Sequence, residues 1–126
     1  MTVPKFAAIG LSLALIFSAA SAFADGDAAK GKKVFKKCKA CHTIKKDGKN
    51  KIGPNLFGVV GRKSASVEGF KYSKAMKAAD LTWDDDNLQK YLTKPRKFIP
   101  KNKMSFAGIK KESQREDLIA YLATFK

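Results

Sequence analysis

The sequence has few histidines, arginines and acidic residues. Its 126 residues include one histidine, and 11 Asp or Glu stand against 26 Lys or Arg, for a formal net charge of +15. A single imidazole excludes every metal site that needs two or more. Only three of the cations are arginine, a poor supply for bidentate reading of bases, so no nucleic-acid partner is predicted. The lysine excess indicates acidic partners, with at most weak adsorption to an anionic membrane.

The first 24 residues differ from the rest of the chain. They hold no acid and one cation, Lys5, which precedes an apolar stretch over residues 6–20. Ala22 and Ala24 then supply small residues at the two positions that a signal peptidase reads. An uncleaved membrane anchor is the alternative, but the stretch contains polar residues and is only just long enough to span a bilayer. We predict a cleaved signal peptide over 1–24, one mature domain over 25–126 and a periplasmic location.

Helix caps and apolar spacing predict four short helices in the mature chain. The first helix is expected to start at Asp27, and the second to run from Ser73 to Ala79. A capping box of Thr82 and Asp85 is expected to open the third, which runs through Leu92, and a capping box of Ser113 and Glu116 to open the last. The residues expected to face the core are Gly31, Val34, Phe35, Cys38, Leu88, Tyr91, Leu92, Leu118, Ile119, Tyr121, Leu122 and Phe125. Residues 43–69 and 93–111 are predicted loops, and a large apolar cofactor would explain how they are held.

Cys38, Cys41 and His42 form a C-x-x-C-H motif, the pattern of c-type haem attachment. The thiols can add across the two vinyl groups on one porphyrin edge, and the adjacent histidine can reach the iron from the same face. A redox-active disulfide is the alternative, but it would need a βαβ setting, whereas this context is helical. A zinc site would lack a fourth ligand. The motif, the leader and the loop-rich chain together favour one covalently bound haem c.

The second axial ligand cannot be a histidine, because none remains. The mature chain offers Met76 and Met104. Met104 is favoured because it lies in a loop that can bring its thioether to the opposite haem face, whereas Met76 falls in a short predicted helix, where methionine usually fills the core. With both axial positions occupied, the iron exchanges single electrons and does not bind a substrate, so an electron-transfer protein and not an enzyme is expected. A vacant-iron enzyme such as a haem peroxidase would also need a distal acid–base residue.

Beyond the motif, the segments that carry a resemblance are residues 30–35, 53–58, 82–83, 103–108 and 116–122. Together with the motif, they make the mature chain similar to class I cytochromes c, close to bacterial cytochrome c2 and mitochondrial cytochrome c. The resemblance implies an all-α cytochrome c fold, with four to five short helices and long loops wrapped around one covalently attached haem. It also implies that the first and last helices cross. In that crossing, Gly31 and Phe35 would pack on Leu118 and Tyr121.

The resemblance also implies roles for residues around the haem. The Pro54 carbonyl would accept a hydrogen bond from His42, and the Tyr91 side chain would lie near the Met104 sulfur. Arg62, Tyr72 and Trp83 would lie at the propionates, and Phe106 would shield the exposed haem edge. Two departures accompany this match. Lys101 and Asn102 stand where mitochondrial relatives usually have Gly-Thr, and Met76 stands where an asparagine is common. Either Asn102 replaces the threonine contact to a propionate, or the loop differs slightly.

The expected function is that of a soluble, monomeric, monohaem electron carrier between membrane-bound redox complexes. The resemblance implies a path such as that from the cytochrome bc1 complex to a terminal oxidase (cytochrome c oxidase) or a photosynthetic reaction centre. The cations expected to dock on acidic surfaces of these partners are Lys32, Lys37, Lys49, Lys51, Arg96, Lys97, Lys103, Lys110 and Lys111. Residues 94–111 hold seven cations and no acid. A separate acidic patch consists of Asp80, Asp84, Asp85 and Asp86. This asymmetry would orient the protein during an encounter.

Overall fold

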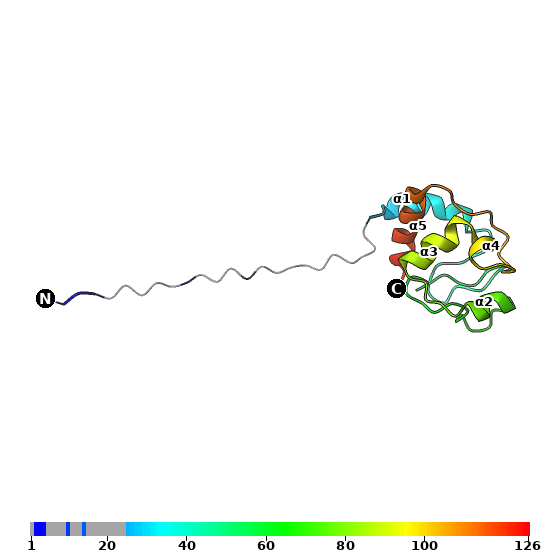
Figure 1. The fold of residues 1–126 in the computed structure, drawn as a ribbon, viewed down its shortest axis with the longest axis horizontal. Helices are drawn as coiled ribbons and strands as arrows, with labels where there is room; N and C mark the ends of the chain where they lie inside the picture. The colour runs from blue at the N-terminus through cyan, green and yellow to red at the C-terminus, as the bar shows by residue number, and fades with distance from the viewer. Residues whose placement is uncertain (1, 5–9, 11–13, 15–24) are drawn as a thin grey trace.

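The computed structural model describes residues 2–4, 10, 14 and 25–126, so most of the predicted signal peptide lies outside the described residues. In the described part of the chain, no helix is long and apolar enough to cross a membrane. The helices are α1 (Ala28–Val34), the 3-10 helix η1 (Phe35–Lys37), α2 (Lys74–Ala79), α3 (Asp85–Thr93), α4 (Pro95–Phe98) and α5 (Glu112–Ala123) (Figure 1). Apart from one isolated bridge between Lys63 and Thr82, residues 25–126 form no β-structure, which confirms the all-α prediction.

The crossing of α1 and α5 is the main contact between helices (Figure 1). At Gly31, a Cβ atom would lie 1.9 Å from the carbonyl oxygen of Asp117 and 2.7 Å from the Cβ of Tyr121. Only glycine allows two backbones to approach this closely. The buried Phe35 ring lies 5.4 Å from the Tyr121 ring, centroid to centroid. The predicted crossing of the first and last helices is therefore confirmed.

Two predicted helix starts are confirmed by their hydrogen bonds. The Asp27 carboxylate accepts from the backbone N–H groups of Ala29 and Lys30 at the start of α1. The Ser73 hydroxyl accepts from the Met76 N–H at 3.0 Å at the start of α2. Both caps act within three residues along the chain, which is why the sequence alone reveals them.

The predicted start of α3 at Thr82 is wrong. The cap is Asp84, whose carboxylate accepts from the Asn87 N–H at 2.8 Å. Thr82 is held in extended backbone by its bridge to Lys63. Its carbonyl also accepts from the Asn87 side-chain amide at 2.8 Å. These contacts keep residue 82 outside the helix.

The predicted capping box at Ser113 is also wrong, because α5 begins at Glu112 and Ser113 lies inside the helix. Lys111 is the N-cap residue and makes no side-chain capping bond. The chain before α5 is held instead by Arg115, whose guanidinium donates to the carbonyls of Ile109 and Lys110, each at 2.8 Å. This long side chain reaches back and fixes the backbone that leads into the helix, although it donates to carbonyls and so does not cap the free N–H groups of the first turn.

The predicted loop over 93–111 contains a short helix, α4. Pro95 occupies its first turn, where the fixed φ of proline favours a helix and the missing N–H costs nothing. Of the residues predicted to face the core, Val34, Cys38 and Tyr121 are half-buried but pack against it. Phe125 lies beyond the end of α5, half-buried, with its ring 5.1 Å from that of Tyr121.

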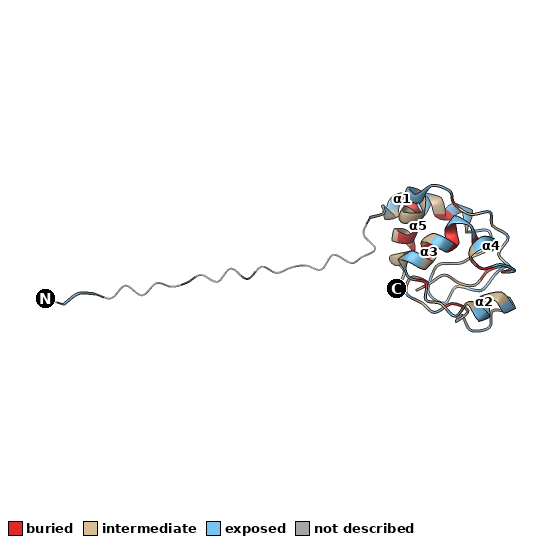
Figure 2. Ribbon diagram, viewed as in Figure 1, coloured by how far each residue is buried: buried red, intermediate tan, exposed pale blue. Residues whose placement is uncertain are grey.

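The core lies where α1, α3 and α5 meet, and Figure 2 shows the buried residues on the inner sides of these helices. The remaining residues predicted to face inward are buried in the structure: Gly31, Phe35, Leu88, Tyr91, Leu92, Leu118, Ile119 and Leu122. The loops on both sides of α2 and α4 then close around a space that this helical core does not fill.

Candidate haem site

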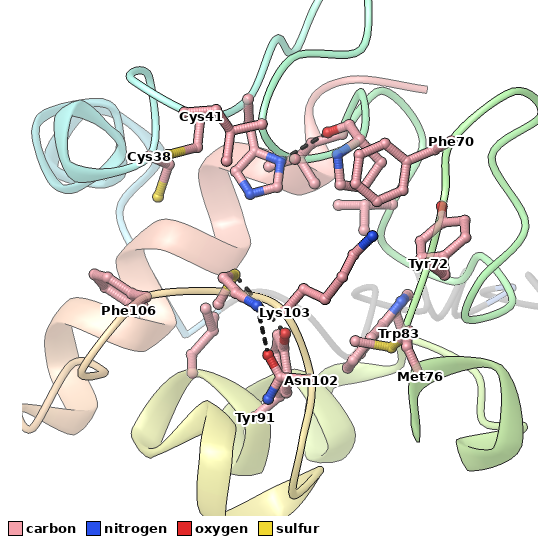
Figure 3. A pocket seen from close by; sticks show the side chains of 18 of the residues that line it. Cys38, Cys41, Phe70, Tyr72, Met76, Trp83, Tyr91, Asn102, Lys103 and Phe106 are labelled. Carbon is pink, nitrogen blue, oxygen red and sulfur yellow. Dashed lines mark hydrogen bonds between the residues drawn. The ribbon is translucent and has the colours of Figure 1, made fainter. Parts of the chain in front are cut away.

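A cavity of about 230 Å³ lies between the helical core and the loops (Figure 3). A single water needs only roughly 10–15 Å³, so this space is suited to an organic group. Its apolar walls come from α3, α5 and the loop after the C-x-x-C-H motif, and include Leu56, Val59, Leu88, Leu92, Leu118 and Leu122. Such walls exclude water from whatever occupies the cavity.

The C-x-x-C-H motif forms a tight turn at one edge of the cavity. The backbone N–H groups of Cys41 and His42 both donate to the Cys38 carbonyl, at 3.1 and 2.9 Å. Cys38, Cys41 and His42 all line the cavity, and Figure 3 shows the two cysteines side by side on the same side of it. This turn directs two thiols and one imidazole to one space.

Cys38 and Cys41 are not joined by a disulfide. Burial, together with the nearby Cys41, raises the pKa of Cys38 to about 11, and Lys37 opposes part of this shift. A redox-active C-x-x-C pair requires the opposite, a cysteine whose pKa is lowered. The environment of Cys38 therefore disfavours the disulfide alternative.

His42 is fixed by two contacts. Its Nδ1 donates to the Pro54 carbonyl at 2.7 Å, and because a carbonyl can only accept, Nε2 carries the lone pair in the neutral ring. The other contact is the face of Gly53, where a Cβ atom would lie 2.3 Å from His42 Cε1. Burial lowers the pKa of His42, and Arg62 and Lys51 lower it further, although the bond to Pro54 opposes them. The result is a neutral, oriented imidazole with a free nitrogen.

Met104 lines the same cavity from the loop after α4. The Tyr91 hydroxyl donates to the Met104 sulfur at 3.7 Å. Burial raises the pKa of Tyr91 to about 12, so this hydroxyl keeps its proton at neutral pH. The Tyr91 ring also packs on Trp83, with centroids 4.8 Å apart. Met76 lines the cavity too, near Trp83 and Tyr72 in Figure 3, so both methionines reach this space.

Arg62 brings an unpaired polar atom to the cavity. One of its terminal nitrogens donates to the Asn55 and Phe57 carbonyls, at 3.2 and 2.9 Å. Its Nε is buried and has no partner among residues 25–126. Burial lowers the pKa of this guanidinium, which an anion beside it would offset. Tyr72, whose hydroxyl accepts from the Val67 N–H at 3.0 Å, lines the same cavity.

These observations fit a covalently attached haem. Two thiols lie at one edge of an apolar cavity, together with an imidazole nitrogen, and thioethers also line it. The unpaired Arg62 Nε is suited to a propionate, because a buried N–H without an acceptor is costly. The side chains of Trp83 and Phe106 complete the lining (Figure 3).

The residues predicted to dock partners lie on the surface, and all nine are exposed: Lys32, Lys37, Lys49, Lys51, Arg96, Lys97, Lys103, Lys110 and Lys111. Lys37 and Lys103 also line the cavity. The Lys103 ammonium donates to the Lys71 carbonyl and lies 5.7 Å from the centroid of the Phe70 ring. Lys51 donates to the Lys39 carbonyl at 2.9 Å.

Phe70 and Ile52 are among the cavity-lining residues that the sequence did not predict as part of the site. Phe70 lines the cavity and packs edge-on against Tyr72, with centroids 4.8 Å apart. Its spacing of two residues from Tyr72 could have revealed it, because such residues share a face of extended backbone. Ile52 lines the cavity although it is 80% exposed. No local pattern in the sequence indicates such exposure.

Comparisons with known proteins agree with this geometry. The family model described as Cytochrome c matches residues 28–126. Cytochrome c2 of Rhodomicrobium vannielii is 48% identical over 98% of this chain and 97% of its own length. Cytochrome c of Gibberella zeae is 54% identical over 79% of this chain and 94% of its own. The chain thus belongs to the cytochrome c family, electron-transfer proteins that carry one covalently bound haem c.

Proposed function

We propose that this protein carries single electrons between membrane-bound redox complexes, with Cys38 and Cys41 as the haem attachments and His42 and Met104 as the axial ligands. When bound, the haem supplies a one-electron couple at its iron. The observation that carries the proposal is the oriented, neutral imidazole of His42 in a cavity that Met104 also lines. Two protein ligands leave no open position for a substrate.

The protein's contribution is to hold both ligands still. The Pro54 carbonyl fixes the His42 ring, and the Tyr91 hydroxyl holds the Met104 sulfur. A histidine whose second nitrogen is hydrogen-bonded keeps its tautomer and its orientation. Ligands that stay in place in both oxidation states suit fast electron transfer and not catalysis.

Other residues adjust the environment of the haem. Arg62, Tyr72 and Trp83 would bind or neutralise the propionates, since these carboxylates are costly to bury without partners. Arg62 has the free Nε for this role. Phe106 would cover the exposed haem edge, and it is half-buried at the cavity.

The ligand assignment is tested by replacing each methionine in turn. Met104→Ala is expected to abolish the charge-transfer band of Met–iron ligation and to let carbon monoxide bind the ferrous protein rapidly. Met76→Leu is the matched control, since it also changes a cavity-lining methionine, and it should keep the band. A band that survives in Met104→Ala would show that the assignment is wrong.

The same proposal places the mature chain, residues 25–126, in the periplasm as a soluble monomer, after cleavage of a signal peptide over 1–24. The match to the Rhodomicrobium vannielii cytochrome c2 extends over 124 residues, which supports treating the leader as part of the protein. Mass spectrometry of periplasmic protein should give the mass of a chain that begins near Asp25 and carries one haem. An intact leader would contradict cleavage.

We further propose that the partners are acidic docking surfaces of the cytochrome bc1 complex and of cytochrome c oxidase or a photosynthetic reaction centre. The nine exposed cations support this choice. The test is to follow oxidation of the reduced protein by membranes of its own source. Oxygen-dependent, cyanide-sensitive oxidation would identify an oxidase, and light-driven oxidation a reaction centre. No oxidation under either condition would refute both acceptors.

A further inference from the structure

Asn102 is a buried polar residue two positions before Met104, in the loop that follows α4. It is only 7% exposed. Its side-chain amide nitrogen donates to the Pro95 carbonyl at 3.0 Å and to the Ile99 carbonyl at 2.8 Å. Its side-chain oxygen accepts from the Met104 backbone N–H at 2.8 Å. Both amide hydrogens and the acceptor are thus used within the protein.

These bonds remove one of the two roles considered for Asn102. Because both of its N–H donors are bound to backbone carbonyls, neither is available to a haem propionate. The side chain instead connects three parts of the backbone: Pro95 at the start of α4, Ile99 at its end, and Met104. Figure 3 shows Asn102 beneath the Lys103 segment, near Tyr91.

The residue before Asn102 explains why such a connection is needed. Lys101 has φ +65°, the left-handed region that costs an L-residue with a Cβ more than it costs glycine. The turn that leads to Met104 is therefore intrinsically unfavourable with lysine at this position. Buried, charge-neutral hydrogen bonds from Asn102 can hold it in place.

We propose that Asn102 is a positioning residue that fixes the Met104 backbone to α4, so that the Met104 thioether stays on the haem iron. The proposal rests on the proposed ligand role of Met104. Asn102 itself touches neither the iron nor a propionate; it acts through the main chain of residue 104. It also offsets the strain of Lys101, so that the two departures from the usual Gly-Thr pair act together.

The test uses the haem-loaded protein and imidazole as a probe that competes with Met104 for the ferric iron. Asn102→Ala should increase imidazole affinity roughly tenfold or more, since three hydrogen bonds that hold the loop are lost. It should also weaken the Met–iron charge-transfer band on mild warming, before the protein unfolds. Imidazole affinity within twofold of wild type would overturn the proposal.

Asn87→Ala is the matched control. Asn87 also donates from its side-chain amide to a backbone carbonyl, that of Thr82, at 2.8 Å, but at the start of α3. It should lower the resistance to unfolding without changing imidazole affinity or the Met–iron band. An equal increase in imidazole affinity in this variant would mean that general destabilisation, and not positioning, explains the effect.

Lys101→Gly tests the coupling with the left-handed turn. Placed in Asn102→Ala, it should recover part of the lost resistance to imidazole, because glycine favours the same backbone conformation. If the double variant is no more resistant to imidazole than Asn102→Ala alone, the proposal that Asn102 offsets the backbone strain at Lys101 is wrong.

If Asn102→Ala yields no haem-loaded protein, hydrogen exchange on the wild type replaces it. The Met104 amide should then exchange much more slowly than exposed loop amides, and equal exchange would overturn the proposal. Failure of the underlying ligand assignment is distinguishable, because Met104→Ala would then leave the Met–iron band of the wild type unchanged.

Discussion

Arg62 and Arg115 make similar hydrogen bonds in different surroundings, so variants of the two can distinguish an effect on the haem site from an effect on the stability of the fold. Arg62 donates to two backbone carbonyls beside the cavity and keeps a buried, unpaired Nε. Arg115 likewise donates to two backbone carbonyls, those of Ile109 and Lys110, but it does not line the cavity. The two side chains therefore form a matched pair.

Arg62→Gln is expected to lower the reduction potential, because removing a positive charge from the wall of the haem cavity favours the more positive, oxidised state of the haem. The expected decrease is roughly 40 mV, equivalent to about 1 kcal/mol for one electron. Voltammetry measures it. Arg115→Gln should destabilise the fold by ~1–3 kcal/mol with a much smaller change in potential. Equal changes in both variants would contradict the proposed place of Arg62 at a propionate.

At this scale the sequence predicts residues whose chemistry is local. Cys38, Cys41 and His42 lie within five positions, so their motif could be identified without any fold. The role of Asn102 could not be predicted, because its partners are backbone carbonyls whose direction depends on α4 and on the turn at Lys101. Backbone geometry of this kind is decided by packing and not by residue type.

Among the helices, the contact of α1 with α5 depends on Gly31. Gly31→Ala would place a Cβ atom 1.9 Å from a backbone carbonyl oxygen of α5, which cannot move without moving the helix. We expect a loss of about 3 kcal/mol or more in the free energy of unfolding, measured with guanidinium on the haem-loaded protein. A loss below 1 kcal/mol would show that the helices can separate at little cost.

Gly61→Ala is the control for that variant. Gly61 has φ +85° and open space where its Cβ would lie, so alanine there meets strain but no clash. The expected loss is about 1 kcal/mol. The difference between the two variants then measures the close approach of the helices and not the general cost of replacing glycine.

The helix boundaries show where local patterns are sufficient. The caps at Asp27 and Ser73 were predictable because each binds an N–H within three residues. The start of α3 was missed by two residues, since Thr82 is held outside the helix by Lys63, far away in the chain. Contacts between distant segments thus choose between neighbouring caps that look equally suitable in the sequence.

Over the whole molecule, charge is distributed unevenly, and this predicts how association depends on salt. Electron transfer with an acidic redox partner should slow as ionic strength rises. Lys97→Gln, which removes an exposed cation of the proposed docking set, should slow it roughly two- to tenfold at low salt and reduce the salt dependence. Stopped-flow kinetics would measure both. A rate that is independent of salt would contradict the proposal that these exposed cations dock the protein on its acidic partner.

Lys90→Gln is the control for this variant. Lys90 forms an ion pair with Asp86 at 2.7 Å, so its charge is already balanced within the acidic patch. The same loss of one cation there should change the association rate much less. Equal effects at both positions would mean that net charge alone, and not its location, controls the encounter.

The pairing of α1 with α5 also determines when the protein can fold. Helix α1 (Ala28–Val34) and its partner α5 (Glu112–Ala123) lie far apart in the chain, so α5 is synthesised and exported well after α1. Closing a loop between segments about 85 residues apart costs ~4 kcal/mol in chain entropy. If the chain is exported as proposed, this contact cannot form until α5 has also crossed the membrane, so the domain would stay unfolded for most of its passage, as export through a narrow pore requires.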